Sequence, residues 1–126
     1  MIFLDTSVLI DALTGPKRSA AALRAAIEEG ERILLPALVL YEWLRGPRLP
    51  QELAAQQSLF PSEAAIAFGW QESALGAKLY RSLRRARGRE MDLAIAACAI
   101  THEAALWTLN VADFRDIPSL CFYSPV

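Results

Sequence analysis

The sequence predicts a single α/β domain in which helices cover a mostly parallel central sheet. Short apolar runs of strand-forming residues alternate along the chain with longer segments of helical periodicity, as in folds built from alternating strands and helices. The 126 residues are 54% hydrophobic and 21% charged, which is enough apolar material for one core. Neither a linker nor an internal repeat divides the chain. We therefore expect residues 1–126 to form one domain, an α/β sandwich.

The first half of the chain begins with an apolar run at residues 2–4 that is typical of a buried parallel strand. Gly15 and Pro16 end the short helix that follows this strand. Pro36 stands where a proline is tolerated, at the start of a helix. The predicted elements are a strand in the first residues, helices at 6–13 and 17–30, a strand at 32–35, and helices at 37–45 and 50–59.

The second half is predicted to contain two helices of different character. The first runs from Gly69 to about Arg87, has a basic C-terminal end and is closed by Gly88. The second, from about Glu90 to Ala104, is rich in alanines that permit close packing against a sheet. The other predicted elements are an extended segment at 64–68, a buried strand at 105–109, a turn at 110–115 with at most one helical turn, and a short strand at 120–123.

The chain carries no segment typical of export or membrane insertion. Its N-terminus lacks a basic region and places Asp5 inside the apolar run, and no apolar segment is long enough to span a bilayer. We expect a cytoplasmic protein with no membrane partner. Cys98 and Cys121 are interpreted as small buried hydrophobic residues. A zinc site of the His/Cys kind is not expected, because His102 is the only histidine.

Four acidic residues form the candidate site. Asp5 and Asp113 follow predicted parallel strands, at the end of an α/β sheet where ligands bind. Glu42 lies in a helix that is apolar on nearly every side, so we expect its carboxylate to be partly buried and paired, coordinated or protonated. Asp92 lies in the first turn of the alanine-rich helix. The fold can bring all four carboxylates to one end of the sheet.

Each of these acids also has a local explanation. Asp5 can cap the following helix, and Glu42 can pair with Arg45 or with another arginine. Asp92 suits the positive end of a helix dipole, and Asp113 suits a turn. Together, however, converging carboxylates repel one another, and the natural compensation for an oxygen-only cluster is a hard divalent cation, Mg²⁺ or Mn²⁺. Such an ion can activate water for phosphodiester cleavage, so the pattern indicates a nuclease.

Four segments of the chain, taken together, resemble the acidic motifs of PIN-domain ribonucleases. Their order and spacing match, and the compact length is similar to that of the VapC toxins of bacterial toxin–antitoxin pairs. The resemblance covers essentially the whole chain. The segments are Ile2-Phe3-Leu4-Asp5-Thr6-Ser7, Tyr41-Glu42-Trp43-Leu44-Arg45-Gly46, Met91-Asp92-Leu93-Ala94-Ile95-Ala96-Ala97 and Thr108-Leu109-Asn110-Val111-Ala112-Asp113-Phe114.

The resemblance implies a PIN-like α/β/α sandwich and endonucleolytic cleavage of RNA that depends on Mg²⁺ or Mn²⁺. It also implies a homodimer and inhibition by a cognate VapB-type antitoxin. It assigns Asp5 and Asp92 as the principal metal ligands. Glu42 and Asp113 would complete the acidic pocket and help to orient the metal and water.

The resemblance also suggests supporting polar residues. Thr6 or Thr108 would hold a carboxylate or a metal-bound water by a hydrogen bond. Some relatives carry an acid at the position of Asn110, where this chain has an amide. Asn110 can still orient a phosphate or water, and the fourth acidic role then falls on Asp113 or on Asp116.

A run of arginines directly precedes Asp92. Its cations could simply favour the C-terminal dipole of a solvated helix. In a protein that must hold a polyanion near carboxylates, the same side chains would bind RNA phosphates, and we favour this interpretation. The five residues, which fall within nine positions, are Arg81, Arg84, Arg85, Arg87 and Arg89.

Other phosphate chemistries find little support in the sequence. The chain has no Gly-x-x-x-x-Gly-Lys loop for nucleoside triphosphates and no Gly-x-Gly-x-x-Gly after the first strand. The remaining alternative is a non-catalytic PIN-like module that binds RNA or regulates another protein. The presence of all four acids argues against this alternative.

Overall fold

The centre of the fold is a parallel sheet of three short strands. The computed structural model describes residues 1–125, in which the strand order is β2-β1-β3. The middle strand β1 (Ile2–Leu4) pairs in parallel with β2 (Ile33–Leu34) and with β3 (Ala105–Trp107). The amide of Asp5 donates to the carbonyl of Trp107 at 2.9 Å, which continues the pairing beyond β1. All three strands therefore end at the same edge of the sheet.

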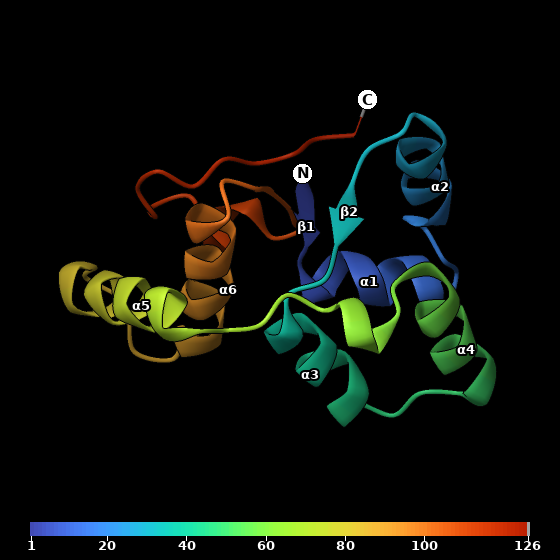
Figure 1. Ribbon diagram of the computed structural model, residues 1–126, viewed down its shortest axis with the longest axis horizontal. Coiled ribbons are helices and arrows are strands. Elements are labelled where there is room, and N and C mark those ends of the chain that lie inside the picture. Colours follow the sequence, from blue (N-terminus) through green and yellow to red (C-terminus); the bar gives the residue numbers. More distant parts are fainter. Residues whose placement is uncertain (126) are drawn as a thin grey trace.

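Helices pack on both sides of this sheet (Figure 1). On one side lie α5 and α6, which pack against each other and, through α6, against β3; on the other side lie α1, α2 and α4. Helix α3 begins near the ends of the strands and packs against α1 and α6. The predicted α/β architecture is confirmed. The helices are α1 (Thr6–Leu13), α2 (Ala20–Glu28), α3 (Ala37–Arg45), α4 (Pro50–Leu59), α5 (Trp70–Ser82) and α6 (Glu90–Thr101), with short 3-10 helices η1 (Ser62–Ala64) and η2 (Val111–Asp113).

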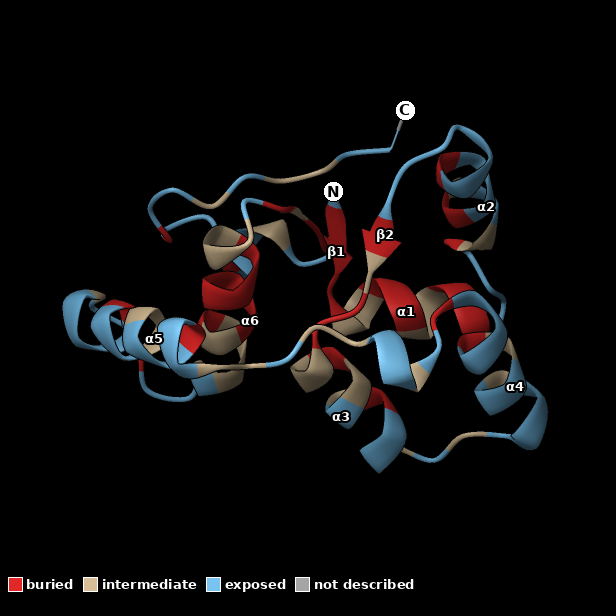
Figure 2. Cartoon of the chain, viewed as in Figure 1, coloured by how far each residue is buried: buried red, intermediate tan, exposed pale blue. Residues whose placement is uncertain are grey.

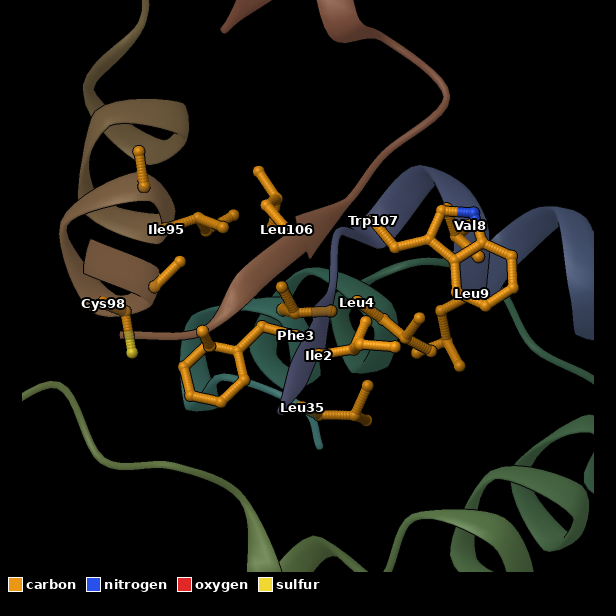
Figure 3. Packing of buried hydrophobic residues seen from close by; sticks show 14 of the residues in the cluster. Ile2, Phe3, Leu4, Val8, Leu9, Leu35, Ile95, Cys98, Leu106 and Trp107 are labelled. Atoms are coloured by element: carbon orange, nitrogen blue, oxygen red, sulfur yellow. The ribbon is translucent and has the colours of Figure 1, made fainter. Parts of the chain in front are cut away.

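The core is made by β1, β3 and the inner faces of α1 and α6 (Figures 2 and 3). Phe3 and Leu4 of β1 are fully buried, as are Leu106 of β3 and Ile95 of α6. Three of the four alanines of α6 are buried as well, which lets α5 and the sheet approach this helix closely. Burial of this apolar surface is the main favourable contribution to the stability of the fold. None of the helices that the structure describes is long and apolar enough to cross a membrane.

Local sequence explains how the elements begin and end. Asp5 is extended (φ −77°, ψ 158°), and its carbonyl accepts hydrogen bonds from the amides of Val8 and Leu9 in the first turn of α1. Pro36 directly precedes α3, where its fixed φ suits the start of a helix. Glu52 accepts a hydrogen bond from the amide of Leu49 at 2.8 Å, which satisfies a donor at the start of α4.

The largest departure from the sequence prediction is the end of α5. The predicted helix 69–87 stops at Ser82, and Leu83 is extended (φ −92°, ψ 144°). The helix ends here because two apolar side chains are drawn toward the core. Leu83 packs against the core and Ala86 is buried. Gly88, at φ +84°, then turns the chain into α6. The segment 83–89 is therefore a loop, and most of the arginine run lies on it.

Three smaller differences concern the ends of the sheet and one cysteine. The predicted strand 120–123 is reduced to a single bridge between Phe122 and Leu106. The extended segment 64–68 pairs only through Ile66, which bridges Pro36. Cys121 is exposed, so the expectation that it would be buried was wrong.

Candidate active site

Asp5 lies at the end of β1, where the sheet delivers it to the edge shared by all three strands. The residue is only 5% exposed. Its Oδ2 accepts hydrogen bonds from Thr108 Oγ1 at 2.7 Å and from Ser7 Oγ at 2.9 Å. The side chain makes no capping hydrogen bond to α1, so the local explanation for Asp5 does not hold. Two hydroxyl groups therefore fix the orientation of a nearly buried carboxylate.

Glu42 reaches the same region from α3. Thr6 Oγ1, in the first turn of α1, donates a hydrogen bond to Glu42 Oε1 at 2.5 Å. The local partner considered for Glu42 is also present, since a guanidinium nitrogen of Arg45 lies 3.5 Å from Oε2. The Arg45 side chain is 56% exposed, so this ion pair is screened by solvent and contributes little. A hydroxyl group from the helix after β1 is thus the principal anchor of Glu42.

Asp92 is the residue on which the other acids converge. It lies in the first turn of α6 and is partly buried. Burial, together with the negative charges of Asp5, Glu42 and Asp113, raises the pKa of Asp92 to about 6. Arg89 opposes this effect only in part. Carboxylates from three other parts of the chain therefore act on Asp92 at the edge of the sheet.

The segment after β3 is held by Arg89. The Arg89 guanidinium donates to both carboxylate oxygens of Asp116, at 2.6 and 2.9 Å, and to the carbonyl of Asp113 at 2.8 Å. This pairing lowers the pKa of Asp116 and occupies its carboxylate. The carboxylate of Asp113, in η2, remains exposed. Asn110 is also exposed, and its backbone N–H donates a hydrogen bond to Thr108 Oγ1 at 3.0 Å.

The other arginines of the run face solvent. Arg81 is in the last turn of α5, and Arg84, Arg85 and Arg87 lie on the loop 83–89. No ion pair joins Arg84, Arg85 or Arg87 to another residue of the described chain. Because the loop leads directly into the first turn of α6, these cations stand close to Asp92 in sequence. Of the five arginines, Arg89 alone is bound by a carboxylate in residues 1–125.

A second cluster of potential metal ligands was missed by sequence reasoning. Glu72, Cys98 and His102 bring their ligand atoms within 4.8 Å of one another, and no other three acidic, cysteine or histidine residues of the described chain do so. The acids of the candidate active site are thus more widely spaced. The expectation that a lone histidine leaves almost nothing to build a zinc site overlooked this cluster. The spacing of Cys98 and His102, four apart in one predicted helix, was the available signal.

The raised pKa of Asp92 predicts a pH-dependent effect of Asp92→Asn on stability. Since the pKa is higher in the folded state than in the unfolded chain, ionisation of Asp92 lowers stability as the pH rises through about 6. Without divalent cations, we expect the substitution to raise the free energy of unfolding at pH 7.5 by about 1 kcal/mol, after allowance for solvent screening. The gain should fade toward pH 4. Urea unfolding of both proteins in EDTA, at pH 7.5 and pH 4, measures this difference in the free energy of unfolding. A variant that is less stable than the parent at pH 7.5 would contradict an unfavourable charge on Asp92.

Comparison with known proteins assigns the fold to a family. A model of the PIN domain matches residues 2–120. The chain is 35% identical over 122 residues to "Ribonuclease VapC19" of Mycobacterium tuberculosis, which covers 95% of this chain and 97% of that protein. Among solved structures, a DNA-bound VapBC from Salmonella typhimurium matches with a TM-score of 0.82 at 19% identity, over 97% of this chain and 96% of that one. VapBC-1 from nontypeable Haemophilus influenzae matches with a TM-score of 0.75 at 23% identity, over 98% of both chains. The chain belongs to the PIN-domain family.

Proposed function

We propose that this protein is a metal-dependent endoribonuclease, the toxin of a type II toxin–antitoxin pair, and that it hydrolyses RNA phosphodiester bonds in the cytoplasm. The observation that carries the proposal is the convergence of Asp5, Glu42 and Asp113 on Asp92, whose pKa is raised by burial and by these three negative charges. The relative that is 35% identical over nearly the whole chain is named a ribonuclease, which supports the same activity. The family and the crowded set of carboxylates thus both support metal-dependent hydrolysis of RNA.

The donor set of the acidic pocket fits Mg²⁺ or Mn²⁺. All four candidate ligands offer oxygen atoms, which hard cations prefer, and their mutual repulsion is the condition that a divalent cation relieves. Mg²⁺ usually keeps several of its water molecules, so it does not require every carboxylate as a direct ligand. We assign Asp5 and Asp92 as the principal ligands, with Glu42 and Asp113 completing the pocket.

The hydroxyl groups around the pocket prepare it for this role. A bound cation would supply an activated water and stabilise the charge that develops on the phosphate. Thr108 and Ser7 both bind Oδ2 of Asp5, which leaves Oδ1 without a hydrogen bond in the part of the chain that the structure describes. Thr6 likewise binds one oxygen of Glu42. Such hydrogen bonds orient metal-binding carboxylates before the metal arrives.

The exposed arginines suit an RNA substrate. Arg84, Arg85 and Arg87 have no carboxylate partner among residues 1–125, and Arg81 is exposed at the end of α5. They offer a series of cations beside an acidic pocket that would otherwise repel a polyanion. We propose that they bind phosphates flanking the cleaved bond. Arg89 contributes through its hold on Asp116 and on the carbonyl of Asp113.

An apolar groove suits an antitoxin partner. The groove, of about 450 Å³, lies between α1, α2 and α4 and is lined by residues that include Leu13, Leu23, Ile27, Ala55 and Leu59. Grooves of this kind take the apolar face of an amphipathic helix. The solved structures of similar fold include several toxin–antitoxin complexes, which supports a VapB-type partner here. We further propose that the toxin acts as a homodimer.

The alternative is a PIN-like module that binds RNA or regulates a protein without cleaving. The crowded pocket argues against it, because four repelling carboxylates destabilise a fold that has no use for a cation. An assay for cleavage separates the two functions directly.

Cleavage of RNA should depend on both the metal and the acids. We expect the purified protein to cut total RNA with Mg²⁺ or Mn²⁺ and to stop when EDTA is added. Asp5→Asn and Asp92→Asn should each reduce the rate by at least about a hundredfold, because each removes negative charge from the metal site. Asp113→Asn should reduce the rate more than Asp116→Asn, since Arg89 already occupies Asp116. Gel analysis of the RNA products measures these rates.

The matched control for this assay is Asp11→Asn, on α1, whose carboxylate accepts a hydrogen bond from Ser19. It makes the same chemical change outside the pocket and should leave the rate unchanged. Intact RNA with the parent protein under every metal condition would favour the non-catalytic alternative.

Removal of the loop arginines should weaken RNA binding in a salt-dependent way. In an Asp92→Asn background, which prevents cleavage, we compare Arg84→Gln/Arg85→Gln/Arg87→Gln with the parent by fluorescence anisotropy. The slope of log affinity against log salt should become shallower by about 2. Each phosphate contact on a single strand contributes roughly 0.7 to the slope, and the variant loses three arginines. A triple variant at Arg18, Arg24 and Arg32 changes the charge equally at exposed positions elsewhere. Equal slopes for the two triple variants would remove this role from the loop.

The antitoxin groove predicts the effect of a single substitution. Ile27 lines the groove and is exposed. We expect Ile27→Gln to weaken binding of the protein encoded by a neighbouring antitoxin gene about tenfold, since burying an aliphatic side chain contributes about 1.5 kcal/mol or more. Leu44→Gln, at an exposed leucine of α3 outside the groove, is the matched control. Calorimetry measures both affinities, and an equal loss in the two variants would place the partner elsewhere.

A further inference from the structure

A buried cluster of three different side chains joins α5 to α6, apart from the acidic pocket. Glu72 is on α5, Cys98 is on α6, and His102 directly follows the last residue of α6. Their ligand atoms all lie within 4.8 Å of one another. Glu72 and Cys98 are 6% and 1% exposed. The His102 side chain is 35% exposed, so the cluster borders solvent on the side of this residue. Figure 3 shows Cys98 on α6 among the buried side chains of the core.

The cluster contains a buried nitrogen that the fold does not satisfy. His102 Nε2 is inaccessible to solvent and makes no hydrogen bond in the described chain. Glu72 Oε2 lies 3.5 Å away, which is within ion-pair range of a protonated imidazole but long for a hydrogen bond. Buried polar atoms of this kind are uncommon and cost stability. The carboxylate, the thiol and the imidazole of this cluster are all ligands for the same class of metal ion.

The Cys98 thiol lacks the properties of a reactive cysteine. Burial and the negative charge of Glu72 raise its pKa to about 12, so the thiol keeps its proton in the absence of a cation. Its low exposure also shields it from oxidants and modifying reagents. The buried sulfur also packs in the hydrophobic core, and it becomes a metal ligand when a cation displaces its proton.

Three structural features position the ligands for one ion. Cys98 and His102 are four residues apart, which places their side chains on the same side of α6. The imidazole ring packs against the ring of Phe3, with centroids 5.6 Å apart, and Glu72 Oε2 accepts a hydrogen bond from the amide of Gly69 at 3.2 Å. These neighbours orient the histidine and the carboxylate in the way that outer contacts orient metal ligands.

We propose that Glu72, Cys98 and His102 bind one zinc ion that joins α5 to α6. Thiolate, imidazole and carboxylate are the ligands that zinc takes in proteins, whereas Mg²⁺ and Mn²⁺ prefer oxygen ligands alone. On binding, a zinc–sulfur bond replaces the S–H bond of Cys98, and the proton leaves to water. Three protein ligands leave a fourth position for a water molecule. The site is independent of the proposed nuclease activity.

Cobalt binding tests the site through a signal that only a thiolate ligand gives. Co²⁺ replaces zinc in such sites, and a cobalt–thiolate bond gives a charge-transfer band in the near ultraviolet. We titrate the full-length protein with Co²⁺ in excess Mg²⁺, which occupies oxygen-only sites. One equivalent of Co²⁺ should produce the band, and one equivalent of Zn²⁺ should remove it.

Substitution of each cysteine supplies a matched pair. Cys98→Ala should abolish the band, whereas Cys121→Ala, at the exposed second cysteine, should leave it unchanged. Zn²⁺ affinity, measured by competition with a chromogenic chelator, should fall about a hundredfold or more in Cys98→Ala. His102→Gln provides a second variant at a partly exposed position and should lower the zinc affinity similarly. Zinc should raise the melting temperature of the parent and of Cys121→Ala, but not of the two site variants.

Three results would overturn the proposal. The first is the absence of a cobalt–thiolate band in the folded parent protein. The second is a band that survives Cys98→Ala and is lost with Cys121→Ala. The third is a zinc affinity that Asp92→Asn abolishes and His102→Gln leaves unchanged, because zinc would then occupy the acidic pocket.

Discussion

The parallel pairing of β1 with β3 is the constraint on which the candidate active site depends. Leu4 is aligned with Trp107, so the next residue of each strand, Asp5 and Thr108, emerges at the same edge and the two side chains form a hydrogen bond. A shift of one residue in this register would turn Asp5 toward the opposite face of the sheet. The apolar side chains of β1 prevent that shift because they are fully buried. Core packing therefore sets the position of Asp5, the first of the proposed metal ligands.

Electrostatics within the pocket oppose the stability that the core supplies. Asp92 lies at the positive end of the α6 dipole, which favours its negative charge, yet its pKa is raised to about 6. Burial and the three neighbouring carboxylates thus outweigh both the dipole and Arg89. The contacts of Arg89 with Asp116 and with the carbonyl of Asp113 hold the segment after β3 against the start of α6, in spite of this repulsion. Active sites commonly keep such unfavourable charge where a cation or substrate will neutralise it.

Much of the fold and of the acidic site could be predicted because the evidence was local in the sequence. The run before Asp5 specifies a buried strand, and proline, glycine and helical periodicity set the limits of α1 and α3 within a residue or two. The end of α5 could not be predicted, since it depends on Leu83 and Ala86 finding apolar contacts that only the folded core provides. Glu72 was missed for the same reason. Its position beside Cys98 follows from how α5 packs on α6, and no spacing in the chain encodes that.

Helix α6 links the two candidate metal sites and separates their chemistry. Asp92 is in its first turn and His102 follows its last residue, ten positions later, which is roughly 15 Å along the helix axis. The negative end of the α6 dipole lies at His102, where it favours a cation. Donor type then sorts the ions: oxygen ligands at the start of the helix select a hard cation, and a thiolate with imidazole at its end selects zinc. Glu72 is in the first turn of α5, so a zinc ion would join the two helices at the end of the pair opposite to the loop 83–89. The loop would hold one end of the helix pair and the zinc ion would hold the other.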